Sequence, residues 1–145
     1  MQFRLARASD FDAVFRGYRE VVREEKRKFF VNYHRKLLRN SIREKRNIVC
    51  VENGKIIGFA EWNPVTPDLP LLFDEGYCWI DWLWVDRKCR RKGVGRKLYE
   101  QIFKLAKKKG FKHIALDVFT VNKAGRNFHE SAGFMERLKI YTRKL

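Results

Sequence analysis

The sequence has few cysteines, which form the disulfides of many secreted proteins, and it has no apolar run long enough to cross a membrane. Its three cysteines, Cys50, Cys78 and Cys89, are odd in number and form no C-x-x-C pair. They indicate neither a disulfide framework nor a zinc site, and they fit the reducing cytoplasm, which is the location we expect. No apolar run approaches the length of a membrane span, and the N-terminal residues lack the apolar core of a signal peptide. We therefore expect no membrane partner.

Two kinds of catalytic site are also missing from the pattern. No cluster of histidine, cysteine and aspartate has the spacing of metal ligands, so we expect no metal. No serine or cysteine stands in a nucleophile elbow, which argues against a covalent intermediate on such a residue.

Acidic residues are scarce relative to basic ones. The 145 residues include 33 Lys and Arg against 17 Asp and Glu, which gives a formal charge of +16. An excess of this size favours polyanionic partners, among which are CoA, RNA and the ribosome surface. The alternative is the Lys- and Arg-rich surface of a thermophile. With 45% hydrophobic residues, the chain is expected to fold as one globular domain over residues 1–145.

The charge is unevenly distributed. Residues 16–46 and 87–109 are dense in Arg and Lys, and for the helix expected at 26–44 we favour a solvated basic face over an RNA site. Between Ile56 and Asp86 there is no Lys or Arg, and this acidic stretch also holds all four tryptophans. Such a stretch can attract cationic amines and stack against their methylene groups. Its six acidic residues are Glu61, Asp68, Asp74, Glu75, Asp81 and Asp86.

The stretch from Trp79 to Leu98 is the most informative part of the chain. An apolar, aromatic strand leads into a basic loop at 87–92, then into Gly93 and Gly95, and then into an amphipathic helix. Glycines let a backbone approach a ligand closely, and the free N–H groups of a helix start bind phosphates. The spacing fits neither a P-loop nor a dinucleotide fingerprint. It predicts an anion-binding turn, and the alternative is a basic surface turn that caps a helix.

Patterns along the rest of the chain predict a fold of the α/β (α+β) class, in the order β-α-α-β-β-β-α-β-α-β. Asn53-Gly54 is a strong hairpin signal, and the prolines between Asn63 and Gly76 predict a loop. This order implies a mixed, mostly antiparallel central sheet flanked by helices. The predicted strands are 3–6, 47–52, 55–62, 77–85, 113–119 and 135–143, and the helices are 9–22, 26–44, 94–109 and 122–132.

Two motifs resemble those of the GNAT superfamily of acetyl-CoA-dependent N-acetyltransferases. The pyrophosphate loop of that family reads Arg/Gln-x-x-Gly-x-Gly/Ala, and Arg90-x-x-Gly93-x-Gly95 follows it, five residues after Val85. The family also carries Asn-x-x-Ala-x-x-x-Tyr-x-x-x-Gly-Phe after its fifth strand. The residues at these offsets are Asn122, Gly125, His129, Gly133 and Phe134.

The resemblance implies transfer of an acetyl group from acetyl-CoA to a primary amine, by direct attack in a ternary complex. It also implies that the Val85 backbone N–H donates to the developing oxyanion. The residues that it assigns to CoA binding are Leu83, Trp84, Val85, Arg90, Arg91, Lys92, Gly93, Val94, Gly95, Arg96, Asn122 and Arg126.

The sequence departs from the family pattern at one catalytic position, since His129 replaces the tyrosine that is proposed in the family to protonate the departing thiolate. A protonated histidine can act as an acid near neutrality, but it can also merely hydrogen-bond the thiol or have no role. Two carboxylates are candidates for the base that makes the amine neutral. We favour Asp117 as the proton acceptor and Asp81 as a contact for the amine, on the expectation that Asp81 shares the face of Val85. For each of them the alternative is a core hydrogen-bond acceptor.

The acceptor is expected to be a polyamine, a lysine side chain or a protein N-terminus. A rival interpretation is a catalytically silent module on the same fold, which binds CoA or associates with RNA or the ribosome. The sequence leaves open whether the protein is a monomer or a homodimer.

Overall fold

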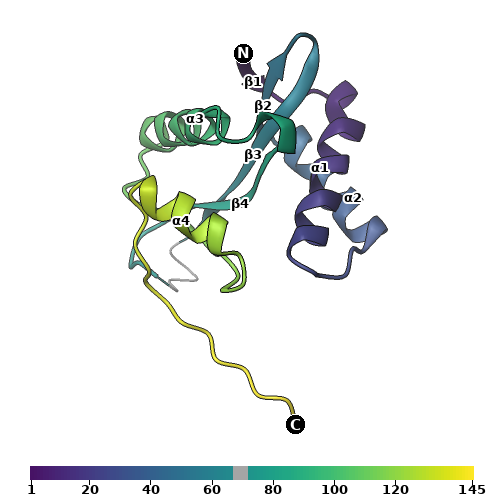
Figure 1. The fold of residues 1–145 in the computed structure, drawn as a ribbon. Coiled ribbons are helices and arrows are strands. Elements are labelled where there is room, and N and C mark those ends of the chain that lie inside the picture. Colours follow the sequence, from purple (N-terminus) through teal and green to yellow (C-terminus); the bar gives the residue numbers. More distant parts are fainter. Residues whose placement is uncertain (67–71) are drawn as a thin grey trace.

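A five-stranded sheet separates two layers of helices in the computed structural model, which describes residues 1–66 and 72–145. Helices α1 and α2 cover one face, and α3 and α4 cover the other (Figure 1). The strands are β1 (Gln2–Leu5), β2 (Asn47–Glu52), β3 (Lys55–Val65), β4 (Tyr77–Val85) and β5 (Ile114–Leu116). The helices are α1 (Phe11–Glu24), α2 (Val31–Arg43), α3 (Val94–Lys108) and α4 (Lys123–Ser131), with short 3-10 turns η1 (Ala8–Asp10) and η2 (Arg87–Cys89).

The sheet is mixed and mostly antiparallel, as predicted. Its order is β1-β2-β3-β4-β5, and only the β4–β5 pair is parallel. The predicted hairpin between β2 and β3 is confirmed, because both Asn53 (φ 50) and Gly54 (φ 72) adopt the left-handed conformation that a tight two-residue turn needs.

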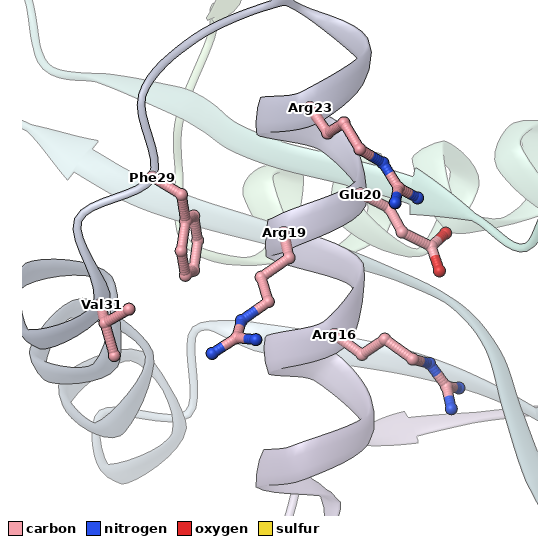
Figure 2. Close-up of a pocket in the computed structure, with 6 residues that line it drawn as sticks. All are labelled: Arg16, Arg19, Glu20, Arg23, Phe29 and Val31. Atoms are coloured by element: carbon pink, nitrogen blue, oxygen red, sulfur yellow. The ribbon is translucent and has the colours of Figure 1, made fainter.

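The layer formed by α1 and α2 packs its apolar side on β3 and β4. Tyr18 and Leu38 are fully buried there against Phe59 and Trp84. Gly17 lets α1 come close, because a Cβ at this position would lie 2.5 Å from the Phe59 ring. The outer side of α1 carries the arginines drawn in Figure 2.

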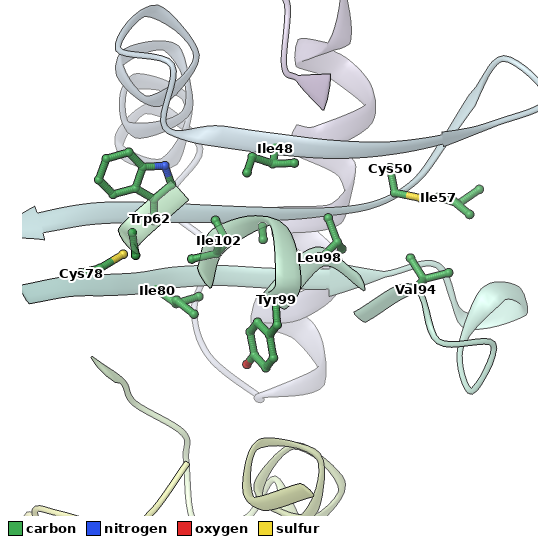
Figure 3. Packing of buried hydrophobic residues seen from close by; sticks show 12 residues of the cluster. Ile48, Cys50, Ile57, Trp62, Cys78, Ile80, Val94, Leu98, Tyr99 and Ile102 are labelled. Carbon is green, nitrogen blue, oxygen red and sulfur yellow. The ribbon is translucent and has the colours of Figure 1, made fainter. Parts of the chain in front are cut away.

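The layer formed by α3 and α4 covers the other face of the sheet (Figure 3). Leu98, Tyr99 and Ile102 of α3 are buried against residues of β2, β3 and β4. Phe128 of α4 and Phe134 extend this cluster, since both rings pack on Tyr99. None of the helices in residues 1–66 and 72–145 is long and apolar enough to span a membrane.

The predicted last strand, residues 135–143, is wrong. The chain leaves α4 at Gly133 and continues to its end without regular structure, extending away from the sheet (Figure 1). Met135 (88% exposed), Ile140 (82%) and Tyr141 (88%) remain in solvent. An alternation of apolar and polar residues forms a strand only where a partner strand is available. β5 is the strand at that edge, and its three residues are too few to pair with a long strand.

Other differences concern element ends. The helix predicted from residue 26 begins at Val31, because Lys26 adopts a left-handed conformation (φ 55) and ends the preceding helix without a glycine signal. β3 continues through Pro64, although we expected irregular structure from Asn63 onward. Pairing with β2 ends at Glu61, so the position of the missing N–H of Pro64 faces no strand within residues 1–66 and 72–145. Residues 67–71 of the predicted loop lie outside the described residues.

Candidate active site

β4 is paired on both sides only along its first half. β3 pairs with β4 along its whole length except at Asp81, whereas β5 pairs only with residues 78–80, because β5 ends at Leu116. Along the edge from Asp81 to Val85, alternate N–H and C=O groups therefore face no strand of the described residues. An extended ligand that carries amide groups can pair with an edge of this kind.

The turn after β4 collects free N–H groups. Asp86 caps η2 by accepting a hydrogen bond from the Lys88 N–H at 2.9 Å. Arg91 (φ 61) and Gly93 (φ 81) then adopt left-handed conformations directly before α3. The N–H groups of residues 91–93 find no acceptor among the described residues, and α3 has no side-chain cap. Such a concave array of donors at a positive helix end binds anions.

Two of the basic side chains hold the turn in place. Arg90 donates from Nε to the Val85 carbonyl (2.9 Å) and from Nη2 to Glu24 (2.9 Å). Arg87 donates from Nε to the same carboxylate at 3.0 Å. Partial burial raises the pKa of Glu24, but the hydrogen bonds from Arg90 and Arg87 outweigh it, so the pKa lies below its usual value. Both guanidinium groups thus fasten the turn to α1.

The other basic side chains of the turn are open to solvent. Arg91, Lys92 and Arg96 are exposed, and none of them forms an ion pair within the part of the chain that the structure describes. Arg96 Nη2 lies 3.5 Å from the Ser131 carbonyl at the end of α4. These three cations surround the free N–H groups and can add charge to an anion site.

The two glycines of the turn have different roles. Gly93 is needed for its left-handed conformation, since a Cβ there would meet nothing within 4 Å. At Gly95 the reason is close packing, because a Cβ would lie 3.1 Å from the Phe128 ring of α4. Gly95 thereby brings α4 against the start of α3.

α4 begins with a side-chain cap. Asn122 Oδ1 accepts a hydrogen bond from the Gly125 N–H at 2.9 Å. A Cβ at Gly125 would lie 2.4 Å from Asn122 Nδ2, which explains glycine at a position where the family usually has alanine. Arg126 is half-buried, and its Nε has no hydrogen-bond partner in the described residues. The contacts of Asn122 and Arg126 with CoA remain predictions.

His129 points at a tyrosine that the sequence did not single out. Its Nδ1 lies 2.6 Å from the hydroxyl of Tyr99, which is 1% exposed. Burial raises the pKa of Tyr99, so the phenol keeps its proton, and burial lowers the pKa of His129. The lowered pKa favours the neutral imidazole, and Nδ1 accepts a hydrogen bond from the Tyr99 hydroxyl in the tautomer that carries its hydrogen on Nε2. The role of His129 in catalysis stays a prediction.

Asp81 occupies a β-bulge. Glu61 pairs with Trp82 and Trp62 pairs with Ile80, so Asp81 has no partner on β3. The extra residue turns the side chain toward α1 and α2, where it accepts a hydrogen bond from Asn63. Because of the bulge, Asp81 does not share the face of Val85, contrary to our expectation. Burial raises the pKa of Asp81 to about 6, although Asn63 and Arg46 oppose this shift.

Asp117 is exposed and lies directly after the end of β5, whereas we expected it inside the strand. Its charge contributes to the raised pKa of Asp81. The structure thus brings both candidate bases to the point where β4 and β5 separate. Only Asp81 lies in a partly buried environment.

A third carboxylate in this region was missed as a site residue. Glu61 is 3% exposed and accepts hydrogen bonds from the Tyr18 hydroxyl and, at 3.1 Å, from Asn47 Nδ2. Burial raises its pKa to about 7, and the charge of Asp81 acts in the same direction. An acidic residue within an apolar strand can be recognised in the sequence as a candidate site residue. The hydrogen-bond partners of Glu61 could not, because they come from distant parts of the chain.

The acidic, aromatic stretch does not form one surface. Trp62 and Trp84 are buried in the cores on opposite faces of the sheet. Glu75 pairs with Lys112, and Asp68 lies outside the described residues. What remains near the separation of β4 and β5 is Trp82, stacked on Tyr18, together with the carboxylates described above.

The sequence matches the family described as "Acetyltransferase (GNAT) family" over residues 13–134. A comparison with curated proteins gave no match. Among the described residues no group of three or more His, Cys, Asp or Glu side chains could hold a metal ion.

Solved structures share the fold. A tetramutant of the BH1408 protein from Bacillus halodurans is 24% identical with a TM-score of 0.86, and the alignment covers 100% of both chains. The aminoglycoside N-acetyltransferase AAC(6')-Iy, solved with CoA, is 18% identical with a TM-score of 0.76 and 99% coverage of each chain. A ribosomal-protein-alanine N-acetyltransferase from Brucella melitensis biovar Abortus 2308 is 14% identical with a TM-score of 0.74, covering 99% of this chain and 98% of that one.

The family match covers most of the chain, and its limits include the turn before α3, the bulge in β4 and the motif on α4. The chain therefore belongs to the GNAT family of acetyltransferases.

Proposed function

We propose that the protein transfers an acetyl group from acetyl-CoA to a primary amine, by direct attack in a ternary complex. The observation that carries this proposal is the unpaired edge of β4 at residues 81–85, next to the free N–H groups at the start of α3. The structure of AAC(6')-Iy with CoA supports a CoA site on this fold.

The residues of the turn fit the charge and shape of CoA. The N–H groups of residues 91–96, with the exposed side chains of Arg91, Lys92 and Arg96, would hold the pyrophosphate. The open edge from Leu83 to Val85 would pair with the amides of the pantetheine arm, and the Val85 N–H would face the thioester carbonyl. When bound, acetyl-CoA supplies the activated acetyl thioester. Arg90 acts by holding the turn to Glu24.

Asp81 is better suited than Asp117 to accept the proton of the amine. An ammonium has no lone pair, so a base must take its proton before attack. With a pKa raised to about 6, Asp81 is ionised at neutral pH and is a stronger base than an exposed carboxylate. We therefore assign proton acceptance to Asp81, directly or through water, and the contact with the incoming amine to Asp117.

His129 and Tyr99 would together stabilise the departing thiolate. When the Tyr99 hydroxyl donates to Nδ1, the imidazole hydrogen is on Nε2. Nε2–H can then donate a hydrogen bond to the sulfur as the C–S bond breaks, and the thiolate takes its proton from solvent, while Tyr99 keeps its own proton. His129 touches the leaving group in this scheme, and Tyr99 acts through it.

The acceptor is proposed to be a cationic primary amine. The charge of Asp117 acts on Asp81, which directly precedes Trp82 in β4, and carboxylates and an aromatic ring both favour a cation. Aminoglycoside and ribosomal-protein N-acetyltransferases among the structural neighbours have acceptors with amino groups. The Arg27 guanidinium lies over Phe119 (5.1 Å) and Trp82 (6.0 Å), so it marks a place where a cation is accommodated.

Isothermal titration with acetyl-CoA and with desulfo-CoA tests the cofactor site first. Arg91→Gln/Lys92→Gln should weaken binding roughly tenfold or more, and Lys107→Gln/Lys108→Gln on the last turn of α3 is the matched control. A screen of polyamines, lysine peptides and peptide N-termini for acetyl transfer then tests the acceptor class. Binding of RNA without binding of acetyl-CoA would favour the catalytically silent module instead.

A further inference from the structure

The outer face of the α1–α2 layer carries a group of arginines that the candidate active site does not use. Figure 2 shows Arg16, Arg19 and Arg23 projecting from successive turns of α1 around a groove of about 490 Å³, which Phe29 and Val31 also line. Arg39 and Arg43 of α2 line a second groove of about 320 Å³. We call Arg16, Arg19, Arg23, Arg35 and Arg39 the arginine face.

The charge of this face is not neutralised within the described residues. None of its five members forms an ion pair there. Two of the three acids of α1 bind other partners. Glu20, which also lines the first groove, accepts from Trp84 Nε1 at 2.9 Å, and Glu24 binds Arg87 and Arg90. The third, Asp12, forms no ion pair in the described residues. Positive charge without local partners has to be satisfied by water or by an external anion.

Aromatic rings hold several of these guanidinium groups. Arg19 lies over the rings of Phe15 and Phe29, at 5.4 Å from each centroid. Arg35 lies over Phe15 at 5.5 Å, and Arg39 lies over Phe11 at 5.7 Å. A stacked guanidinium loses little freedom on binding and keeps its N–H edge available for phosphate. This arrangement differs from a freely solvated lysine surface.

Exposed aromatic side chains border the arginine face. Phe30 is 53% exposed and stands between Phe29 and Val31, which line the first groove. Tyr33 is 60% exposed in the first turn of α2. Lys28 lies over the Phe30 ring at 5.2 Å. Rings interleaved with cations suit unstacked bases, which an acidic peptide or a regular duplex does not offer.

We propose that the arginine face binds single-stranded RNA, with phosphates on the arginines and bases against Phe30 and Tyr33. The site lies on the helical layer opposite to α3, so it is separate from the turn that would hold CoA (Figure 1). RNA binding here is compatible with catalysis and does not depend on it.

Fluorescence anisotropy with a labelled 15-nucleotide single-stranded RNA, from 50 to 300 mM KCl, tests the proposal on the full chain. Arg16→Gln/Arg19→Gln/Arg23→Gln should reduce the slope of log K against log[KCl] by about 2, since each phosphate contact to a single strand contributes about 0.7. Affinity at 150 mM KCl should fall about tenfold or more. The matched control is Lys104→Gln/Lys107→Gln/Lys108→Gln, which removes the same charge from exposed positions of α3 and should leave affinity within about threefold.

A second variant separates RNA from other polyanions. Phe30→Ser/Tyr33→Ser keeps every charge and should weaken RNA binding about tenfold, with no effect on acetyl-CoA binding or on the melting temperature beyond a few degrees. Equal losses in the two charge triples, no saturable binding at 150 mM KCl, or competition by polyglutamate as effective as by RNA would each overturn the proposal. Loss of RNA binding with intact acetyl-CoA binding isolates this face from the proposed function.

Discussion

Replacing Asp81 with asparagine is expected to make the fold more stable and catalysis slower at the same time. The carboxylate occupies the bulge of β4, where burial raises its pKa from 3.8 to about 6. An amide at this position keeps an oxygen that can accept the hydrogen bond from Asn63. The substitution therefore removes the buried charge and leaves the contact.

The size of the effect follows from the pKa. A pKa raised from 3.8 to about 6 corresponds to about 3 kcal/mol at about 1.4 kcal/mol per unit. Between these pH values the folded state binds more protons than the unfolded state, so stability falls as pH rises through this window. The full penalty is present above pH 6 and absent below about pH 4. The charge of Asp81 also raises the pKa of Glu61, so removing this charge relieves Glu61 as well and adds to the gain in stability.

Urea unfolding of the wild type and of Asp81→Asn at pH 8 and at pH 4 measures this difference. We expect the free energy of unfolding of the variant to be higher by about 2–3 kcal/mol at pH 8, which corresponds to roughly 8 °C in melting temperature. At pH 4 we expect almost no difference. The acetylation rate at pH 8 should fall about 100-fold, as is usual for loss of a general base. The control is Asp74→Asn, an exposed acid of the same stretch. A variant that is less stable at pH 8, or stabilised equally at both pH values, would refute the reasoning.

Three further predictions concern the surroundings of this site. Tyr99→Phe should lower kcat about tenfold in steady-state kinetics, with KM for acetyl-CoA unchanged. The reason is that the imidazole of His129 loses the donor that keeps its hydrogen on Nε2. An unchanged kcat would remove Tyr99 from the scheme. Gly93→Ala should cost about 1–2 kcal/mol of stability and weaken acetyl-CoA binding, because the residue has φ 81; an unchanged thermal melt would contradict it. Glu61→Gln should raise the free energy of unfolding in urea more at pH 8 than at pH 5, because burial raises the pKa of Glu61 to about 7. Equal gains at the two pH values would show that the charge of Glu61 is not the cause.

Local signals in the sequence predicted the parts of the fold that depend on neighbouring residues. Asn53-Gly54 needs only its own backbone conformation to form the hairpin. The strand, basic turn and helix around Gly93 are consecutive, so their pattern can be read without knowledge of the rest of the chain. The two family motifs are equally local, and the family match agrees with the fold that they implied.

Features that depend on distant partners were not predictable in the same way. The last strand has the alternation of a strand but finds no partner in the described residues. His129 was recognised from its motif, but the Tyr99 hydroxyl that lies 2.6 Å from its Nδ1 belongs to another helix. Glu61 was visible as an isolated acid in an apolar strand, yet its partners Tyr18 and Asn47 lie on other elements.

The bulge in β4 explains why an aspartate can occupy position 81 at all. In a regular strand, residue 81 would share the face of Leu83 and Val85, which pack in the apolar cluster under α3. A carboxylate there would have no polar partner of the kind that Asn63 provides, and its burial would cost more than the shift to a pKa of about 6. The bulge moves the side chain to the other face, at the position where β5 stops pairing. One local irregularity thus lowers the cost of burying the charge and places it beside the edge that is open to a substrate. We therefore expect that deleting one residue, which makes the strand regular, abolishes activity in a protein that still folds.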